Sequence, residues 1–167
     1  MLQNLVNKFL IDFDPHARED LSTLSEEEVL KKKNQRLIYE LTILMPFTKV
    51  KQGRYLIGSE VHSVQVKGNG VLLRTGGGFI LVSEYMLHNA RAEAIKLDHL
   101  MKTQNMTLQE VVIGIIKKTP GTQKEQKAFL KRCPPEVDTQ FRSLVQQLHE
   151  IEPEMFRQHV KQRKSIK

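Results

Sequence analysis

The sequence predicts an α+β fold in which a small antiparallel sheet of three to four strands is covered by a helix and flanked by helical N- and C-terminal extensions. Before residue 46 and again after about residue 80, apolar residues recur every three to four positions, which is the period of an amphipathic helix. Between these parts glycine becomes frequent and the apolar period shortens to two, which is typical of strands. We therefore divide the chain into a helical extension (1–46), an α+β module (47–100) and a helical region with a basic tail (101–167).

The N-terminal segment predicts a short amphipathic helix that ends at Asp14-Pro15, because proline disfavours helix in the residue before it. Its polar face carries few basic residues, so we expect the helix to pack on the rest of the protein rather than lie on a membrane surface. The apolar face consists of Leu2, Leu5, Val6, Phe9 and Leu10.

A second helix is expected between Ser25 and Pro46. The Ser25 side chain can accept a hydrogen bond from a free amide of the first turn, and the three glutamates that follow it favour the positive end of the helix. Its apolar stripe covers only about two heptads, which indicates a helix docked on a core rather than a long coiled coil. The stripe consists of Leu30, Leu37, Leu41 and Leu44.

The central segment contains the strand patterns. Gly53–Gly58 (GRYLIG) predicts a short strand between glycine turns. Val64 and Val66 then alternate with polar residues, and Gly68-Asn69-Gly70 can form the hairpin turn before a return strand at 71–73. The residues that follow have helical spacing and are expected to cover the apolar face of the sheet through Leu81, Val82, Tyr85, Met86 and Leu87.

From about residue 100 the chain is expected to be helical again. Thr107 can cap a helix that Pro120-Gly121 ends, and a basic stretch follows. Pro134-Pro135 then starts another helix, since proline is favoured at a helix start. A last, separate helix before the basic tail is predicted by Met155, Phe156 and Val160.

Composition and charge narrow the class of partner. The chain has 167 residues, with 26 Lys and Arg against 19 Asp and Glu, a net charge of +7. Such a balance favours an acidic partner: nucleic acid, an anionic membrane or a polymer such as a microtubule. No apolar run is long enough to span a membrane, so a membrane partner is not expected.

Motifs for catalysis or metal binding are missing from the sequence. Gly76-Gly77-Gly78 lacks the following Lys-Ser/Thr of a phosphate loop, and the six histidines lack metal-ligand spacing. The single cysteine, Cys133, excludes a disulfide framework and a multi-cysteine zinc site. No serine or cysteine stands in a recognisable nucleophile motif. We therefore expect a non-enzymatic protein without cofactor or metal.

Basic residues form the strongest remaining pattern. A second basic stretch runs from Lys117 to Arg132, with Glu125 as its only acidic residue. In the strand-rich part, from 47 to 81, the only acidic residue is Glu60. The basic residues of that part are Lys49, Lys51, Arg54, Lys67 and Arg74.

Residues 53–88, about a quarter of the chain, resemble the growth-arrest-specific-protein-related (GAR) domain of spectraplakins and of the growth-arrest-specific family. The landmarks appear in the family's order: GRY with a hydrophobic pair and a glycine, a strand and turn, VLLR for the family's VMVR, then GGG, an aromatic residue and a hydrophobic helix. The matching positions are Arg54, Tyr55, Gly58, Arg74, Gly76, Gly77, Gly78 and Phe79.

The resemblance implies a small α+β module that binds microtubules, with Lys49, Lys51, Arg54, Lys67 and Arg74 facing acidic tubulin. It implies a structural protein of the cytoplasm and cytoskeleton. Our specific expectation is the axoneme of a cilium or flagellum, with the helical extensions docked on other cytoskeletal or axonemal proteins.

The chain also departs from the GAR pattern. Phe79 stands where the family has tryptophan and is expected to keep the aromatic plug. Ala90–Glu93 stands where the family has Asp-Pro-Cys-Arg, and the other zinc cysteines are missing. The alternative is a nucleic-acid-binding module, which is not favoured because Tyr55, Phe79 and Tyr85 are expected in the core rather than in an exposed stacking row.

Overall fold

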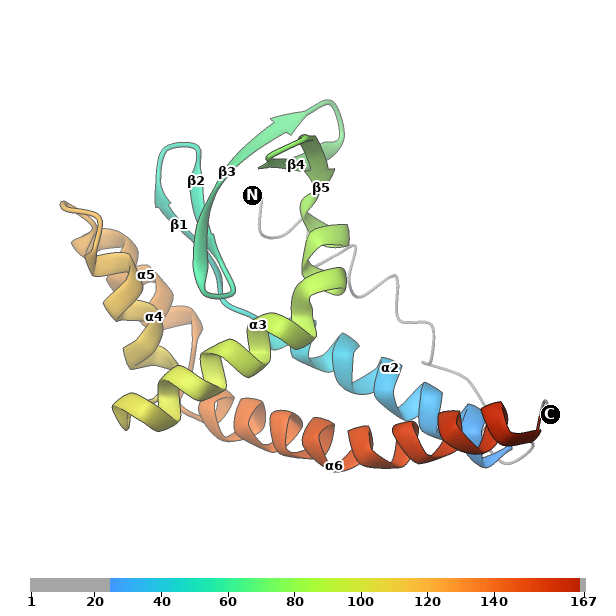
Figure 1. Ribbon diagram of the computed structural model, residues 1–167. Coiled ribbons are helices and arrows are strands. Elements are labelled where there is room, and N and C mark those ends of the chain that lie inside the picture. The colour runs from blue at the N-terminus through green and yellow to red at the C-terminus, as the bar shows by residue number, and fades with distance from the viewer. Residues whose placement is uncertain (1–24, 166–167) are drawn as a thin grey trace.

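The structure is a computed structural model that describes residues 25–165, with side chains described up to residue 153. The helix expected at Leu2–Leu10 lies outside these residues. The described chain is α+β, as predicted, and consists of a meander of strands between helices (Figure 1). In chain order the elements are α2 (Glu26–Leu44), β1 (Phe47–Lys51), β2 (Arg54–Ile57), β3 (Glu60–Lys67), β4 (Gly70–Thr75), β5 (Gly78–Leu81), α3 (Val82–Gln104), α4 (Leu108–Lys117), α5 (Gln123–Arg132) and α6 (Glu136–Ser165).

The sheet has five antiparallel strands in the order β1-β2-β3-β4-β5, so the predicted number of three to four is too low. β2 pairs with the first half of β3, up to Ser63, and β4 pairs with the second half, from Val64 onward. The two end strands have weak sequence patterns. β1 has a bulge between Lys49 and Lys51 that breaks the alternation, and β5 has only four residues.

Side chains on one face of the sheet form a hydrophobic cluster with the beginning of α3. Val64 and Leu73 are paired across β3 and β4, and both lie in this cluster with Val82, Met86 and Ala90 of α3. That α3 covers the whole face, as expected from the sequence, stays a prediction. On the opposite face the sheet is buried at the β1–β2 end, and the β3–β5 end lacks such a cluster among the described residues.

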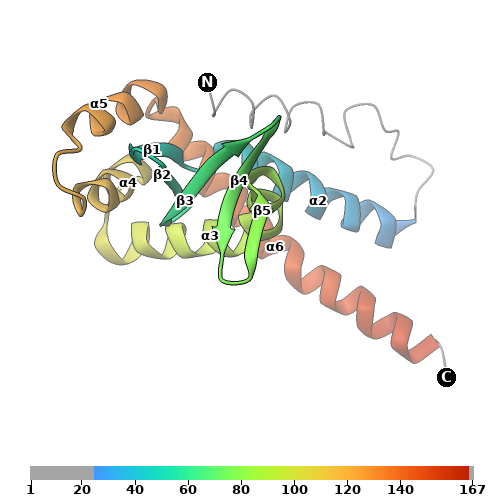
Figure 2. The same ribbon diagram turned by 90° about the horizontal axis from the view of Figure 1, so that it is seen from above.

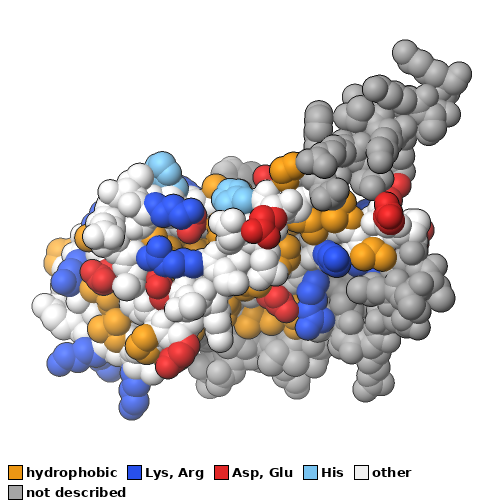
Figure 3. All heavy atoms as spheres, turned by 90° about the horizontal axis from the view of Figure 1, so that it is seen from below, with side chains coloured by type: hydrophobic (Ala, Val, Ile, Leu, Met, Phe, Trp, Pro, Cys, Tyr) orange, Lys and Arg blue, Asp and Glu red, His pale blue; other side chains and the backbone are white. Residues whose placement is uncertain are grey.

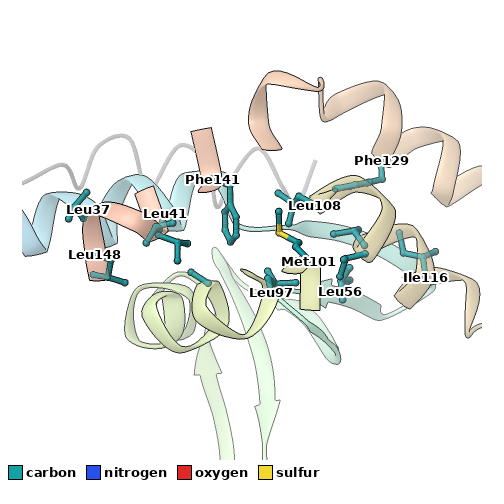
Figure 4. Packing of buried hydrophobic residues seen from close by; sticks show 14 of the residues in the cluster. Leu37, Leu41, Leu56, Leu97, Met101, Leu108, Ile116, Phe129, Phe141 and Leu148 are labelled. Carbon is teal, nitrogen blue, oxygen red and sulfur yellow. The ribbon is translucent and has the colours of Figure 1, made fainter. Parts of the chain in front are cut away.

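A larger hydrophobic cluster joins the helices to the β1–β2 hairpin (Figure 4). α2 and α6 are in contact and run alongside each other in Figure 1, whereas Figure 2 shows the C-terminal part of α6 diverging from α2. The buried residues labelled in Figure 4 come from each of the five described helices and from β2: Leu37, Leu41, Leu56, Leu97, Met101, Leu108, Ile116, Phe129, Phe141 and Leu148.

The predicted start and end points of two helices are confirmed. α2 begins after Ser25, whose Oγ accepts a hydrogen bond from the Glu28 amide at 3.3 Å, and it ends before Pro46. α4 begins after Thr107, which forms a reciprocal capping box with Glu110. Both caps depend on residues close in sequence, which explains why the sequence predicts them.

The C-terminal region differs from the prediction in two elements. The two helices expected after Pro134-Pro135 are one helix, α6, which continues through Pro153. The basic stretch forms a helix of its own, α5, which has Phe129 as its buried residue. The apolar residues of α5 are consecutive in sequence and do not recur every three to four positions, so the sequence pattern does not reveal this helix. Among the described helices, none is long and apolar enough to cross a membrane.

Candidate functional site

The outward face of β3, β4 and β5, which we call the basic sheet face, has no acidic side chain. Strand pairing places Gln65 opposite Leu72, and Leu72 opposite Leu81. Arg74 is opposite Phe79. The side chains of paired residues in antiparallel strands lie on the same face of the sheet, and so do the side chains of every second residue along one strand. The basic sheet face therefore consists of Ser63, Gln65, Lys67, Leu72, Arg74, Phe79 and Leu81.

Phe79 and Leu81 are exposed on this face, by 56% and 37% respectively. This corrects the expectation that Phe79 is an aromatic plug and that Leu81 belongs to the helix covering the sheet. The register explains the difference, because Ile80 is the residue of β5 that pairs with Leu73 and packs against the hydrophobic cluster of the sheet. The neighbours of Ile80 on both sides must then point outward.

The charged groups of the basic sheet face are free of ion pairs within the described chain. Lys67 and Arg74 are both exposed, and no described carboxylate lies within 4.0 Å of either. Arg74 is the direct cross-strand neighbour of Phe79, so a basic and an exposed aromatic side chain leave the sheet next to each other on the same face. Positive charge next to exposed apolar surface is the composition of a binding surface for an acidic partner.

The other predicted contact residues lie nearer to β1. Lys51 pairs with Arg54, and Arg54 pairs with Ser63, to whose Oγ its Nη1 donates a hydrogen bond at 3.4 Å. These two basic residues therefore face the same side as the basic sheet face. Lys49 pairs with Tyr55 instead and faces the opposite side, where its Nζ donates to Gln52 Oε1 at 3.4 Å. The structure thus separates Lys49 from the other four.

Of the three consecutive glycines, Gly76 and Gly77 form the turn between β4 and β5, and Gly78 is the first residue of β5. A side chain at Gly76 or Gly77 would meet no atom within 4 Å, so no close approach explains them. Gly78 has φ +145°, a conformation that other residues rarely adopt. The turn is closed by Thr75, whose hydroxyl donates to the Gly78 carbonyl at 3.2 Å. The glycines therefore shape the hairpin that presents Arg74 and Phe79.

Gly58 has a different role, because the buried Glu93 carboxylate of α3 lies against it. A Cβ at Gly58 would be 2.6 Å from Glu93 Oε2, and φ at Gly58 is +66°. The same oxygen accepts hydrogen bonds from the Ser59 amide at 2.9 Å and from the Ser59 hydroxyl at 2.5 Å. This contact, which we call the Glu93 latch, fastens α3 to the turn between β2 and β3.

Sequence reasoning missed the Glu93 latch. Glu93 follows Met86 and Ala90 on the buried face of α3, and an acidic residue in such a series is the pattern that could have indicated it. It also lies in the segment Ala90–Glu93, one of the places where the sequence departs from the pattern that it resembles. In this chain a hydrogen-bonded carboxylate links the helix and the sheet at that place.

Next to the latch lie His62 of β3 and Tyr85 of α3, whose Nε2 and hydroxyl oxygen are 3.3 Å apart. Burial lowers the pKa of His62, although the nearby carboxylates of Glu60 and Glu93 act in the opposite direction. Burial also raises the pKa of Tyr85. Glu60 is paired at 2.9 Å with Lys96, which lowers the pKa of its carboxyl group. His62 and Tyr85 therefore favour their neutral forms where they meet.

Cys133 is half-buried at the end of α5, near the Gln109 side chain, whose Nε2 lies 3.5 Å from Sγ. Burial raises the pKa of the Cys133 thiol, which is the opposite of the activation that a nucleophilic cysteine needs. Among the described residues, no group of three His, Cys, Asp or Glu side chains could hold a metal ion.

The face seen from below in Figure 3 differs from the basic sheet face. There, basic, acidic and hydrophobic side chains are interspersed, and no region of one sign stands out. No protein-family model, curated protein or solved structure matches the chain.

Proposed function

We propose that this chain is a non-enzymatic, microtubule-associated structural protein that binds acidic tubulin through the basic sheet face. The observation behind the proposal is the acid-free face on which exposed Arg74 and Phe79 are neighbours and to which Lys67 belongs. Lys51 and Arg54 extend the positive charge on the same side of the sheet. That the acidic partner is a microtubule, rather than another acidic polymer, is proposed from the resemblance of residues 53–88 to the GAR domain.

The arrangement suits a partner with dense negative charge and some apolar surface. Aromatic and arginine residues are enriched among the residues that dominate binding energy, and Phe79 and Arg74 are such a pair. The cellular setting that we propose is the cytoskeleton, with the ciliary or flagellar axoneme as the specific case. There, the helices outside the sheet would dock on neighbouring proteins.

Nucleic acid is the second candidate, and the exposed ring of Phe79 is the observation in its favour. Single-stranded nucleic acids stack successive bases on several aromatic side chains. Phe79 is the one aromatic residue of the basic sheet face, which is why we rank tubulin first. Tight binding of a fluorescent oligonucleotide at physiological salt, without binding to microtubules, would reverse this order.

The test is co-sedimentation with taxol-stabilised microtubules over a salt series, with intact microtubules and with microtubules whose acidic tails subtilisin has removed. We expect binding that weakens with salt and with removal of the tails. The double variant Lys67→Glu/Arg74→Glu should bind about tenfold more weakly or worse. The matched control is Lys31→Glu/Lys33→Glu on exposed positions of α2, which makes the same change in net charge. Equal binding by the two double variants would refute the assigned face.

A further inference from the structure

A second basic surface lies on α5. Lys124, Lys127 and Lys131 are exposed, and their spacing of three and four residues places them within about 60° of one another around the helix. Phe129, the buried residue of the same helix, lies about 170° from the middle of this stripe. We call these three residues the α5 lysine stripe; it points away from the core.

The direction of the stripe is fixed by contacts on the other side of α5. Phe129 is buried in the larger hydrophobic cluster. Arg132 Nη2 donates a hydrogen bond at 2.6 Å to Oγ1 of Thr48, which is itself buried in β1. At the start of the helix, Thr122 is buried and its hydroxyl donates to the Ile116 carbonyl at 3.1 Å. α5 is therefore held at both ends, and the lysines project from a fixed base.

The lysines of the stripe have no ion-pair partner within the described part of the chain. Lys117 and Lys118, at the end of α4, add two more exposed positive charges close by in sequence. Salt bridges to neighbouring carboxylates usually reduce the potential of a lysine-rich helix, and here that reduction is missing. The surface is thus suited to attract an anionic partner.

The α5 lysine stripe and the Arg74–Phe79 end of the basic sheet face lie at opposite edges of the sheet, with Lys51 and Arg54 between them. α5 contacts β1, the first edge strand, whereas Arg74 and Phe79 lie on β4 and β5 at the other edge. α5 and the β4–β5 hairpin are also separated in Figures 1 and 2. Two basic surfaces at opposite edges of one sheet can face two different partners.

We propose that the α5 lysine stripe is a second binding surface for an acidic protein polymer, so that one chain bridges two microtubules. This inference rests on the proposed function, because it takes the first surface to be bound to a microtubule. It adds that the chain cross-links the polymer and does not merely coat it. A single rigid unit with two separate cationic surfaces needs neither a dimer nor a second domain for this purpose.

The test separates binding from bridging. The full chain is mixed with taxol-stabilised microtubules at physiological ionic strength; high-speed pelleting measures binding, and low-speed pelleting with dark-field microscopy measures bundles. The variant Lys124→Glu/Lys127→Glu is compared with the control Lys31→Glu/Lys33→Glu, which has the same net charge. We expect the α5 variant to bind with its Kd changed by less than about twofold, because distant sites act independently. Its bundles should disappear, and the control should bundle like the unaltered protein.

Four outcomes would overturn the inference. Binding of the unaltered protein without bundles would overturn bridging and leave the proposed function standing. Bundles that persist in the α5 variant would assign cross-linking to another surface or to self-association. A several-fold weaker affinity of the α5 variant for single microtubules would place both surfaces on one polymer. Failure of the unaltered protein to pellet with microtubules would refute the proposed function and the inference together.

Discussion

Replacing Gly58 by alanine tests the Glu93 latch directly. The new Cβ would lie 2.6 Å from Glu93 Oε2 and 2.9 Å from both Cδ and Cγ, so the whole end of the side chain must move. Glu93 is only 7% exposed, which leaves the displaced carboxylate without easy access to water. Its hydrogen bonds to Ser59 would then be stretched or broken.

The magnitude follows from these contacts. A residue other than glycine in the left-handed conformation costs about 1 to 2 kcal/mol. Loss of a hydrogen bond to a charged group costs about 1.5 to 3 kcal/mol. Alanine lowers the conformational entropy of the unfolded chain, which offsets about 0.4 to 1 kcal/mol of this loss of stability. We expect Gly58→Ala to lower the free energy of unfolding by about 2 to 4 kcal/mol, because the backbone and latch effects combine.

The matched control is Gly53→Ala. Gly53 also has positive φ, at +75°, but a side chain there would meet no atom within 4 Å. Its expected cost is therefore the backbone effect alone, about 0.5 to 1 kcal/mol after the entropy gain. Urea unfolding followed by far-UV circular dichroism measures both variants. Equal losses of stability would refute the latch.

A double-mutant cycle sharpens the result. In a Glu93→Ala background the carboxylate is gone, so Gly58→Ala should cost no more than Gly53→Ala does in the unaltered chain. Glu93→Ala itself is destabilising because it leaves the part-buried Ser59 amide without its acceptor. A cost of Gly58→Ala that is the same in both backgrounds would show that Glu93 is not the group against which the new methyl group collides.

Three further predictions concern stability and binding. Burial lowers the pKa of His62 in the folded state, so the contribution of neutral His62 to the free energy of unfolding is fully present above the ordinary histidine pKa of about 6.5 and is lost as the pH falls below it. The urea midpoint should therefore fall less steeply between pH 8 and pH 5 in His62→Gln than in the unaltered chain. Equal falls of the midpoint in the two proteins would refute this prediction. Thr107→Ala removes the capping box of α4 and should cost about 1 kcal/mol; Thr103→Ala is the control, and equal small effects would contradict the cap. Phe79→Ala should leave the urea midpoint nearly unchanged, because the ring is exposed, and should weaken microtubule pelleting; a large loss of stability would mean that the ring is buried in solution.

How far the sequence predicts the fold depends on the range of the interactions. Ser25 and Thr107 cap their helices through residues three positions away, so both helix starts are visible in the sequence. α5 is different, because its position depends on Phe129 in a distant core and on the contact between Arg132 and Thr48, 84 residues away. No local pattern contains that information.

The candidate site shows the same distinction. The sequence identifies Lys67 and Arg74 as basic residues of strands, and their side of the sheet follows from simple alternation. Lys49 is separated from them because β1 has a bulge after it, which only the pairing with β2 reveals. The sequence predicts Phe79 inside the module, and the register with β4 turns it outward.

The continuity of α3 determines how the sheet and the helical layer respond to force and to heat. Ala90 belongs to the hydrophobic cluster of the sheet and Ala94, one turn later, to the larger cluster of the helices. A helix cannot melt at one turn without losing the packing on both sides of it, so opening of either layer should loosen the other. Amide hydrogen exchange along α3 should therefore be slow and uniform through 90–98. A force applied at the β4–β5 hairpin would therefore be transmitted along α3 into the larger hydrophobic cluster, because the helix is packed in both clusters.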